Sequence, residues 1–489
     1  MTPSAAFSDI TPAERARLLH AVADALDAAA GELVPLAAEE THLPIPRLTG
    51  ELGRTTFQLR LYADEITAGR VHDIREDPAD PDWPTGPRPR LTRIRVPIGP
   101  VLIFAASNFP FAFSVAGTDT AAALAAGCPV VVKAHPGHPK LSRRVAALVS
   151  DVLPAGAITL IEGEQAGRDA LQDPRIRAAA FTGSLAGGRA LFDLAAARPE
   201  PIPFYGELGS VNPAFVTRAA LASRRDEILR GFAGSYTLGL GQFCTKPGVL
   251  FVPAGLGAEQ ALIEILADAP GGALLNSRIA SGHRDARAEL AAHAGVRVAV
   301  AGQADDTSAT PALLVTGTDT ILDVLHEAFG PTAILVEYTD ELSLLTLAAQ
   351  LPGQLTATVH AEPGEAITGP LLRELADHAG RVILNGWPTG VSVSPAMHHG
   401  GPYPATTAPL HTSVGTAAID RFLRPVTFQN VPHDALPPAW GLPAAAPLSQ
   451  SAARQSAASL SQSAASLSSA PLSSAPHSLS AASRSKETA

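Results

Sequence analysis

The 489-residue sequence predicts an α/β protein in which a doubly wound parallel sheet is followed by a second α/β region. Continuous apolar runs, typical of strands buried on both faces, occur at residues 99–106, 129–133, 158–161 and 178–181. Helical patterns at 114–126, 141–152 and 167–172 separate these runs. Because strands that alternate with helices pair in parallel through crossover connections, this order favours a Rossmann-type sheet.

The segment before the sheet reads as two helices. Thr11 can cap a helix over residues 11–31, Pro12 suits its first position, and apolar residues recur at helical spacing. A second helix is expected over 47–67, and the Pro- and Asp-rich stretch 72–89 is expected to be a linker. Residues 91–96 alternate apolar and polar side chains, which predicts a strand with one exposed face.

After Gly209 the strand and helix alternation resumes with longer connections, which indicates a second α/β domain up to about residue 420. Residues 421–430 read as a closing strand. From residue 443 the chain consists of Ser/Ala/Leu repeats with few aromatic or charged residues. Such a composition predicts a disordered tail without a catalytic part.

The bulk composition narrows the class of protein. A net charge of −10 argues against a nucleic-acid partner, and no apolar run of eighteen residues predicts a membrane span. The two cysteines have dissimilar surroundings, so no disulfide framework is expected. The N-terminus shows no secretory signal. We therefore expect an enzyme of the cytoplasm.

The two cysteines differ in what surrounds them. Cys128 lies in an apolar run that enters a strand, where a thiol behaves as a small hydrophobic group. Cys244 lies in Gly-Gln-Phe-Cys-Thr-Lys-Pro-Gly, without apolar periodicity and with glycines that would let another molecule approach the backbone. Cys244 is therefore either a nucleophile or an incidental thiol.

Four further segments place useful chemistry at predicted strand ends, where open α/β sheets bind ligands. Asn108 can donate to an oxyanion or cap a helix, and Lys133 can reach a ribose or phosphate or extend to water. Gly183-Ser184 precedes a helix and can seat a phosphate or form a plain turn. Glu207 stands among apolar and glycine residues, where it can serve as a general base or be a solvated carboxylate.

The order and spacing of these segments, together with His326-Glu327-Ala328-Phe329-Gly330-Pro331, resemble the aldehyde dehydrogenase superfamily. The resemblance runs from about residue 10 to about residue 432. It implies a cofactor-binding domain at 1–84 and 98–208, a catalytic domain at 209–420, and oligomerisation strands at 85–97 and 421–432. A homodimer or homotetramer is expected.

The resemblance also assigns roles to individual residues. Cys244 would attack an aldehyde, Asn108 and the Cys244 backbone N–H would hold the oxyanion, and Glu207 would activate water for thioester hydrolysis. No metal is expected. The residues implied for the cofactor are Lys133 and Glu327 at the riboses, Gly163 at the adenosine, Gly183 and Ser184 at the pyrophosphate, and Phe329 at the nicotinamide.

One departure from the family bears on the choice of cofactor. Many members that prefer NAD carry a glutamate three residues after the lysine, and Pro136 stands there in this chain. His135 and His138 add groups that can carry positive charge. We therefore expect NADP to be preferred, with NAD as the other possibility, unless both histidines are ordinary surface residues.

Within the superfamily the sequence is most similar to the α-ketoglutaric semialdehyde (2,5-dioxovalerate) dehydrogenases, which implies oxidation of 2,5-dioxopentanoate to 2-oxoglutarate. Arg54 and Gln58 stand at i and i+4 on one expected helix, where they would grip the substrate carboxylate. Phe109 and Phe113 would wall the aldehyde end, and Arg54 could instead pair with Glu51. The segments that carry this resemblance are 106–114, 133–136, 204–213 and 399–407.

The sequence leaves three competing functions open. The first is oxidation of another small aldehyde, such as succinic semialdehyde. The second is a cofactor-independent cysteine hydrolase, which needs a histidine beside Cys244 but leaves Lys133 and Glu327 without a role. The third is a non-catalytic binding protein, for which the presence of both Cys244 and Glu207 would be unexplained.

Overall fold

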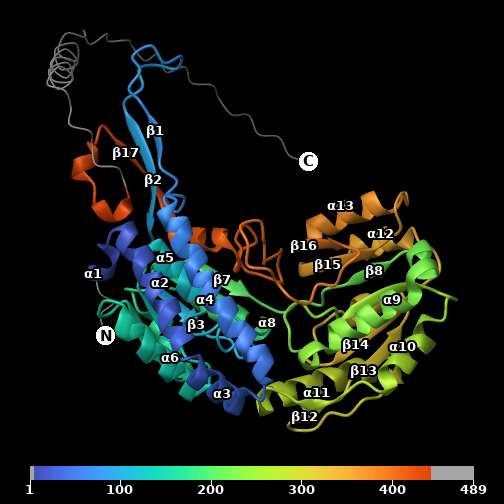
Figure 1. Ribbon diagram of the computed structural model, residues 1–489. Coiled ribbons are helices and arrows are strands. Elements are labelled where there is room, and N and C mark those ends of the chain that lie inside the picture. The colour runs from blue at the N-terminus through green and yellow to red at the C-terminus, as the bar shows by residue number, and fades with distance from the viewer. Residues whose placement is uncertain (1–4, 442–489) are drawn as a thin grey trace, which may run out of the picture. The chain divides into compact units, whose positions relative to one another are not determined.

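Two largely parallel sheets dominate the computed structural model, which describes residues 5–441 (Figure 1). Residues 5–430 with 437–441 make one unit, and residues 431–436, which include the short 3-10 helix η4 (His433–Ala435), belong to another. The expected tail from residue 443 lies outside the described residues. Within residues 5–441, no helix is long and apolar enough to cross a membrane.

The first sheet has five parallel strands in the order β5-β4-β3-β6-β7. All four strands that the apolar runs predicted are present in it, so the predicted α/β class and doubly wound sheet are confirmed. Phe104, Lys133 and Thr182 end neighbouring strands, and Thr182 pairs with Glu207 on the next one. The register therefore gathers these carboxyl ends at one edge of the sheet. The strands are β3 (Val101–Phe104), β4 (Val130–Lys133), β5 (Ile158–Ile161), β6 (Ala178–Thr182) and β7 (Phe204–Glu207).

Helices cover both faces of this sheet (Figure 1). One face packs into a large apolar core with the helices α2, α4, α5 and α6, and the other packs against α7 and α8. Burial on both faces explains why the strands are continuously apolar. The helices are α2 (Pro12–Ala28), α4 (Ile45–Thr67), α5 (Thr118–Ala126), α6 (Pro139–Val152), α7 (Glu164–Gln172) and α8 (Leu185–Ala196).

The helices before β4 differ from the prediction in three places. Thr11 caps α2 and accepts a hydrogen bond from the Glu14 N–H at 3.3 Å, but α2 ends at Ala28 and a separate helix, α3 (Ala30–Thr41), follows. A short helix, α1 (Ala5–Ser8), precedes them. The helix expected to begin at residue 114 begins only at Thr118, whose N–H donates to the Ala112 carbonyl at 2.8 Å in a preceding turn.

The second sheet has seven strands in the order β11-β13-β14-β9-β8-β15-β16, parallel except for the edge strand β11. Helices α9 and α10 contribute to the apolar core on one face, and α11, α12 and α13 to the core on the other. Its strands are β8 (Ala214–Val216), β9 (Val249–Pro253), β11 (Arg297–Val300), β13 (Ala312–Thr316), β14 (Thr332–Tyr338), β15 (Gln354–His360) and β16 (Ala379–Leu384). Its helices are α9 (Arg218–Thr237), α10 (Ala258–Ala267), α11 (Ser277–Ala292), α12 (Ser343–Ala348) and α13 (Thr368–His378).

A third, antiparallel sheet joins β1 (Arg75–Asp77), β2 (Leu91–Pro97) and β17 (Leu423–Gln429). The stretch 72–89, expected to be a linker, therefore contains strand β1, whose three residues all pair with β2. The remaining short elements are β10 (Gly272–Ala273), β12 (Ser308–Ala309), and the 3-10 helices η1 (Leu238–Gly241), η2 (Ile321–Val324), η3 (Thr416–Phe422) and η5 (Pro438–Trp440).

Candidate active site

Cys244 lies on a short loop between η1 and β9. The glycine at position 241 has a φ of 67°, and a Cβ built there would meet the Gly330 carbonyl oxygen at 2.2 Å. Likewise, a Cβ at Gly248 would meet the Val211 carbonyl oxygen at 2.9 Å. The flanking glycines thus admit other parts of the same chain, which corrects the interpretation that they admit another molecule.

Two buried side chains hold this loop in place. The Asn212 Nδ2 group donates to the carbonyl oxygens of Cys244 at 2.8 Å and Lys246 at 2.9 Å. The buried Lys246 Nζ donates to the carbonyl oxygens of Ala328 at 2.7 Å and Thr332 at 2.8 Å. These bonds tie the nucleophile loop to the segment that carries Glu327.

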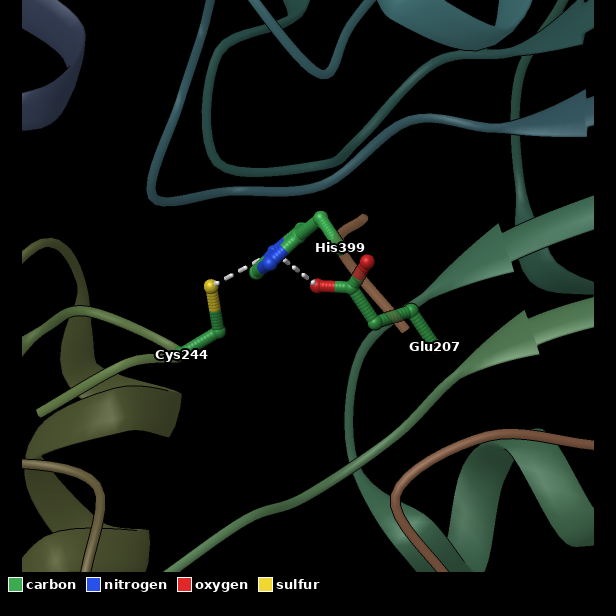
Figure 2. A group of neighbouring side chains, drawn as sticks. All are labelled: Glu207, Cys244 and His399. Carbon is green, nitrogen blue, oxygen red and sulfur yellow. Dashed lines mark hydrogen bonds and ion pairs between the residues drawn. The ribbon is translucent and has the colours of Figure 1, made fainter. Parts of the chain in front are cut away.

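Glu207 ends β7 and is buried, with its carboxylate directed toward Cys244 and His399 (Figure 2). The Ser413 hydroxyl donates to Oε2 at 2.5 Å, and His399 Nε2 lies 2.9 Å from Oε1. That second contact is close but not aligned, and Oε1 has no hydrogen-bond partner among the described residues. One oxygen of the carboxylate is therefore held and the other is free to accept a proton.

The pKa of Glu207 is set by opposing effects. Burial raises it, but the adjacent His399 imidazole, the hydrogen bond from the Ser413 hydroxyl and the more distant charge of Arg421 together bring the pKa below its ordinary value. Glu207 is therefore an ionised carboxylate at neutral pH, in the protonation state that a general base needs.

His399 is the residue that sequence reasoning missed. Its Nε2 atom lies 3.5 Å from Cys244 Sγ as well as 2.9 Å from Glu207 Oε1, so one nitrogen faces both groups (Figure 2). Its ring is buried, and its backbone N–H donates to the Thr412 hydroxyl at 2.8 Å. His399 is the first residue of the distinctive segment 399–407, so the sequence contained an indication of its importance.

The glycines of that segment explain how it reaches the site. A Cβ at Gly400 would meet the His411 carbonyl oxygen at 2.7 Å, and one at Gly401, where φ is 153°, would meet the Gln354 carbonyl oxygen at 2.1 Å. Further along, the Leu208 N–H donates to the Ala405 carbonyl at 2.8 Å. The segment therefore packs tightly beside β7, which brings His399 against Glu207.

The Cys244 thiol is free and has a pKa well above its ordinary value. Burial is the main cause, followed by the negative charges of Glu207 and Glu327, whereas Arg54 acts in the opposite direction. Such a thiol needs a proton acceptor before it can attack a carbonyl, and His399 Nε2 is in position to be one. This histidine also meets the requirement of the cysteine hydrolase alternative.

Asn108 follows β3 and is buried beside the nucleophile loop. Its Nδ2 group donates to the Gln242 carbonyl at 3.2 Å, and its own carbonyl oxygen accepts from Arg47 Nη2 at 2.7 Å. An amide NH₂ group carries two hydrogens, so one remains for an oxyanion formed at Cys244.

Arg54, Phe109 and Phe113 come together near the thiol. The Arg54 guanidinium lies 5.9 Å from the centre of the Phe109 ring and 5.6 Å from that of Phe113. Among residues 5–441, no ion pair or hydrogen bond engages it. Glu51, the alternative partner, instead accepts the backbone N–H groups of residues 111 and 112. Gln58 is buried one turn further along α4.

The residues expected at the cofactor lie at the carboxyl edge of the five-stranded sheet and beyond it. Lys133 ends β4, Gly163 precedes α7 with a φ of 90° and open space where a Cβ would be, and Ser184 caps α8. A lysine, an open glycine and an exposed helix N-terminus fit a dinucleotide with its phosphates. Gly183 is exposed beside Ser184. Glu327 lies against Gly209; burial raises the pKa of Glu327, and the charge of Lys246 acts to lower it. Phe329 is half-buried on the same segment as Glu327.

The two histidines near Lys133 do not supply the positive charge that the sequence analysis gave them. His138 is fully buried, with Nε2 3.0 Å from the Ala106 carbonyl oxygen and Nδ1 3.1 Å from the Ser142 hydroxyl. Burial also lowers the pKa of His135 to about 3, and its Nδ1 accepts the Gly137 N–H at 3.0 Å. Both imidazoles are therefore neutral near pH 7, and His138 is part of the core.

Two largely parallel sheets, with a cysteine, a histidine and a glutamate in contact at the carboxyl edge of the first, are the arrangement expected of a class of dehydrogenase. Residues 2–403 match the model of the aldehyde dehydrogenase family, and the chain belongs to this family. Solved structures agree on the fold: an aldehyde dehydrogenase from Bacillus cereus superposes with a TM-score of 0.74 over 87% of this chain and 85% of its own, at 22% identity.

Two curated relatives are considerably more similar in sequence. The chain is 45% identical over 453 residues to α-ketoglutaric semialdehyde dehydrogenase 2 of Azospirillum brasilense, which covers 89% of this chain and 86% of the relative. It is 42% identical over 446 residues to α-ketoglutaric semialdehyde dehydrogenase of Acinetobacter baylyi, covering 88% and 85%. The subgroup resemblance noted in the sequence thus extends over most of the chain.

Proposed function

We propose that this protein oxidises 2,5-dioxopentanoate to 2-oxoglutarate with NAD(P) as the electron acceptor. The observation that carries the reaction type is the meeting of Cys244, His399 and Glu207 within a family of aldehyde dehydrogenases. The substrate is supported by the two relatives named for this semialdehyde.

The first half-reaction begins at the thiol. His399 Nε2 accepts the proton of Cys244 Sγ, and the resulting imidazolium is stabilised by the adjacent Glu207 carboxylate. The thiolate then adds to the aldehyde carbon, and the oxyanion accepts hydrogen bonds from Asn108 Nδ2 and the Cys244 backbone N–H. The product of addition is a thiohemiacetal on Cys244.

The second half-reaction uses the free oxygen of Glu207. Once the thiohemiacetal has been oxidised to a thioester, Glu207 Oε1 accepts a proton from water as that water attacks the carbonyl carbon. The hydrogen bond from Ser413 to Oε2 fixes the orientation of the carboxylate for this step. The thiolate leaves, and the acid is released.

A bound nicotinamide cofactor supplies the hydride acceptor. We propose that Lys133, Gly163, Gly183, Ser184, Glu327 and Phe329 hold it in the roles that the family resemblance gives them. We propose that NADP is preferred because Pro136 leaves no carboxylate to repel a 2′-phosphate. The positive charges of Lys133 and Arg278, both of which act on His135, would attract that phosphate. The histidines themselves do not contribute charge, although His135 remains beside the proposed phosphate position.

Arg54 is proposed to bind the substrate carboxylate, with Phe109 and Phe113 walling the aldehyde end and Gln58 supporting the arginine. A half-buried guanidinium that stacks on two rings and is not engaged in an ion pair is suited to an anionic ligand. The enzyme is proposed to act in the cytoplasm as a homodimer or homotetramer.

Steady-state kinetics test the proposal. NAD(P)H formation should be fastest, as kcat/KM, with 2,5-dioxopentanoate among aldehydes that include succinic semialdehyde and pentanal, and faster with NADP than with NAD. Equal kcat/KM for the dioxo acid and pentanal would refute the substrate assignment. Ester hydrolysis without any aldehyde oxidation would favour the hydrolase alternative, since His399 supplies the imidazole that such an enzyme needs.

A further inference from the structure

The catalytic side chains also form a set of metal-ligand atoms. The Cys244 thiol sulfur, an imidazole nitrogen of His399 and a carboxylate oxygen of Glu207 all lie within 4.8 Å of one another (Figure 2). Thiolate, imidazole and carboxylate are the ligands that Zn²⁺ takes in proteins. Moreover, Glu207 Oε1 is a buried acceptor that receives no hydrogen bond from the described residues, so it has a lone pair available to a metal ion.

Of the distances between ligand atoms, the one from sulfur to nitrogen matches a tetrahedral zinc site and the one from nitrogen to oxygen is shorter. With Zn–S of about 2.3 Å and Zn–N of about 2.0–2.1 Å, a tetrahedral angle separates sulfur from nitrogen by about 3.5 Å. Cys244 Sγ and His399 Nε2 are 3.5 Å apart. The separation of 2.9 Å between His399 Nε2 and Glu207 Oε1 is shorter than the tetrahedral value of about 3.4 Å. The glutamate oxygen must therefore move about 0.5 Å away from the nitrogen, while Oε2 is held by the Ser413 hydroxyl.

The charge around the thiol also favours a cation. The carboxylates of Glu207 and Glu327 act on Cys244 as negative charges, and the guanidinium groups of Arg54 and Arg381 act in the opposite direction. Two of the three ligands, the Glu207 carboxylate and the thiolate formed on binding, would carry negative charge toward the dication. Because the ligands are buried or half-buried, the interaction is weakly screened by solvent.

The geometry points to an inhibitory site for Zn²⁺, or a similarly soft divalent cation, formed by Cys244 Sγ, His399 Nε2 and Glu207 Oε1. Binding forms a metal–sulfur bond, releases the thiol proton to solvent, and changes no oxidation state. The metal occupies the lone pairs that would accept the thiol proton and the proton of water, so it stops both half-reactions. The inhibition rests on the proposed function, whereas metal binding itself does not.

Equilibrium dialysis of the full-length protein against ZnCl₂, followed by elemental analysis, measures binding without any substrate. Cys244→Ser and His399→Gln should each weaken zinc binding by at least about tenfold. His398→Gln is the matched control, because this neighbouring histidine is not part of the three-residue set and its loss should leave the affinity unchanged. Co²⁺ in place of Zn²⁺ should give a thiolate-to-metal absorption band that Cys244→Ser abolishes.

Inhibition of aldehyde oxidation by Zn²⁺ should be reversed by EDTA and should follow the same order of variants. Zinc affinity that is unchanged in both Cys244→Ser and His399→Gln would overturn the site, as would the lack of a thiolate band with Co²⁺. Zinc bound through these residues in a protein that does not oxidise 2,5-dioxopentanoate would support the site and refute only the proposed substrate.

Discussion

Replacing Arg54 with methionine removes the proposed carboxylate anchor and keeps much of the side-chain volume. A hydrogen bond to a charged group contributes about 1.5–3 kcal/mol, which corresponds to a loss of roughly 10- to 150-fold in kcat/KM for 2,5-dioxopentanoate. The guanidinium also stacks on Phe109 and Phe113. Loss of that stacking, about 0.5–1 kcal/mol, would cost about two- to fivefold with any aldehyde.

The ratio of kcat/KM for the dioxo acid to that for pentanal separates the two effects. Loss of the stacking lowers kcat/KM for both substrates, whereas loss of the carboxylate contact lowers it for the dioxo acid only. We expect the ratio to fall by at least about tenfold in Arg54→Met. Arg60→Met, on the same helix, is the matched control: Arg60 pairs with Asp24 and Asp27 at 2.6 and 2.8 Å, and its loss should leave the ratio unchanged. Equal losses for both substrates in Arg54→Met would remove Arg54 from carboxylate recognition.

Substitutions at His399 and Pro136, and a comparison of stability at two pH values, test other parts of the structure. His399→Gln should lower kcat/KM by about 100-fold or more in the NAD(P)H assay, because the thiol loses its proton acceptor, and activity close to that of His398→Gln would contradict this role. Pro136→Glu should lower the ratio of kcat/KM with NADP to that with NAD by about tenfold or more, since a carboxylate would repel the 2′-phosphate, and an unchanged ratio would place that phosphate elsewhere. Burial lowers the pKa values of His72, His283 and His360 to about 4. Their contribution to stability is therefore complete above about pH 6.5 and is lost as the pH falls toward 4, so unfolding at pH 5 should need less urea than at pH 7, by about 2 kcal/mol per histidine at most. A urea midpoint equal at both values would contradict the burial of these neutral imidazoles.

The parts of the fold that local chemistry determines could be predicted from the sequence. The continuous apolar strands β3 to β6 and the Thr11 cap of α2 depend on nearby residues, and they are present. Elements that depend on distant contacts were missed. Strand β1 forms only because β2 offers it a partner, and the start of α5 is delayed by a turn closed on the Ala112 carbonyl.

The residues of the candidate site also differ in whether their role depends on local motifs or on distant contacts. Cys244, Glu207 and Asn108 stand in recognisable local motifs, but His399 is 155 residues from Cys244 and reaches it only through the packing of residues 399–407 beside β7. Lys246 stands two residues from Cys244, yet its role as a clamp depends on carbonyl groups of residues 328–332. Burial also reversed the expected charge of His135 and His138, a property that no local pattern reports.

The central claim is that Cys244 carries the substrate as a thioester that Glu207 helps to hydrolyse. Intact-protein and peptide mass spectrometry of Glu207→Gln, mixed with 2,5-dioxopentanoate and NADP, tests it most directly. We expect one NADPH per active site in an initial burst and an acyl group on the peptide that contains Cys244. An acyl group on another residue, or full turnover by Cys244→Ser, would contradict the account.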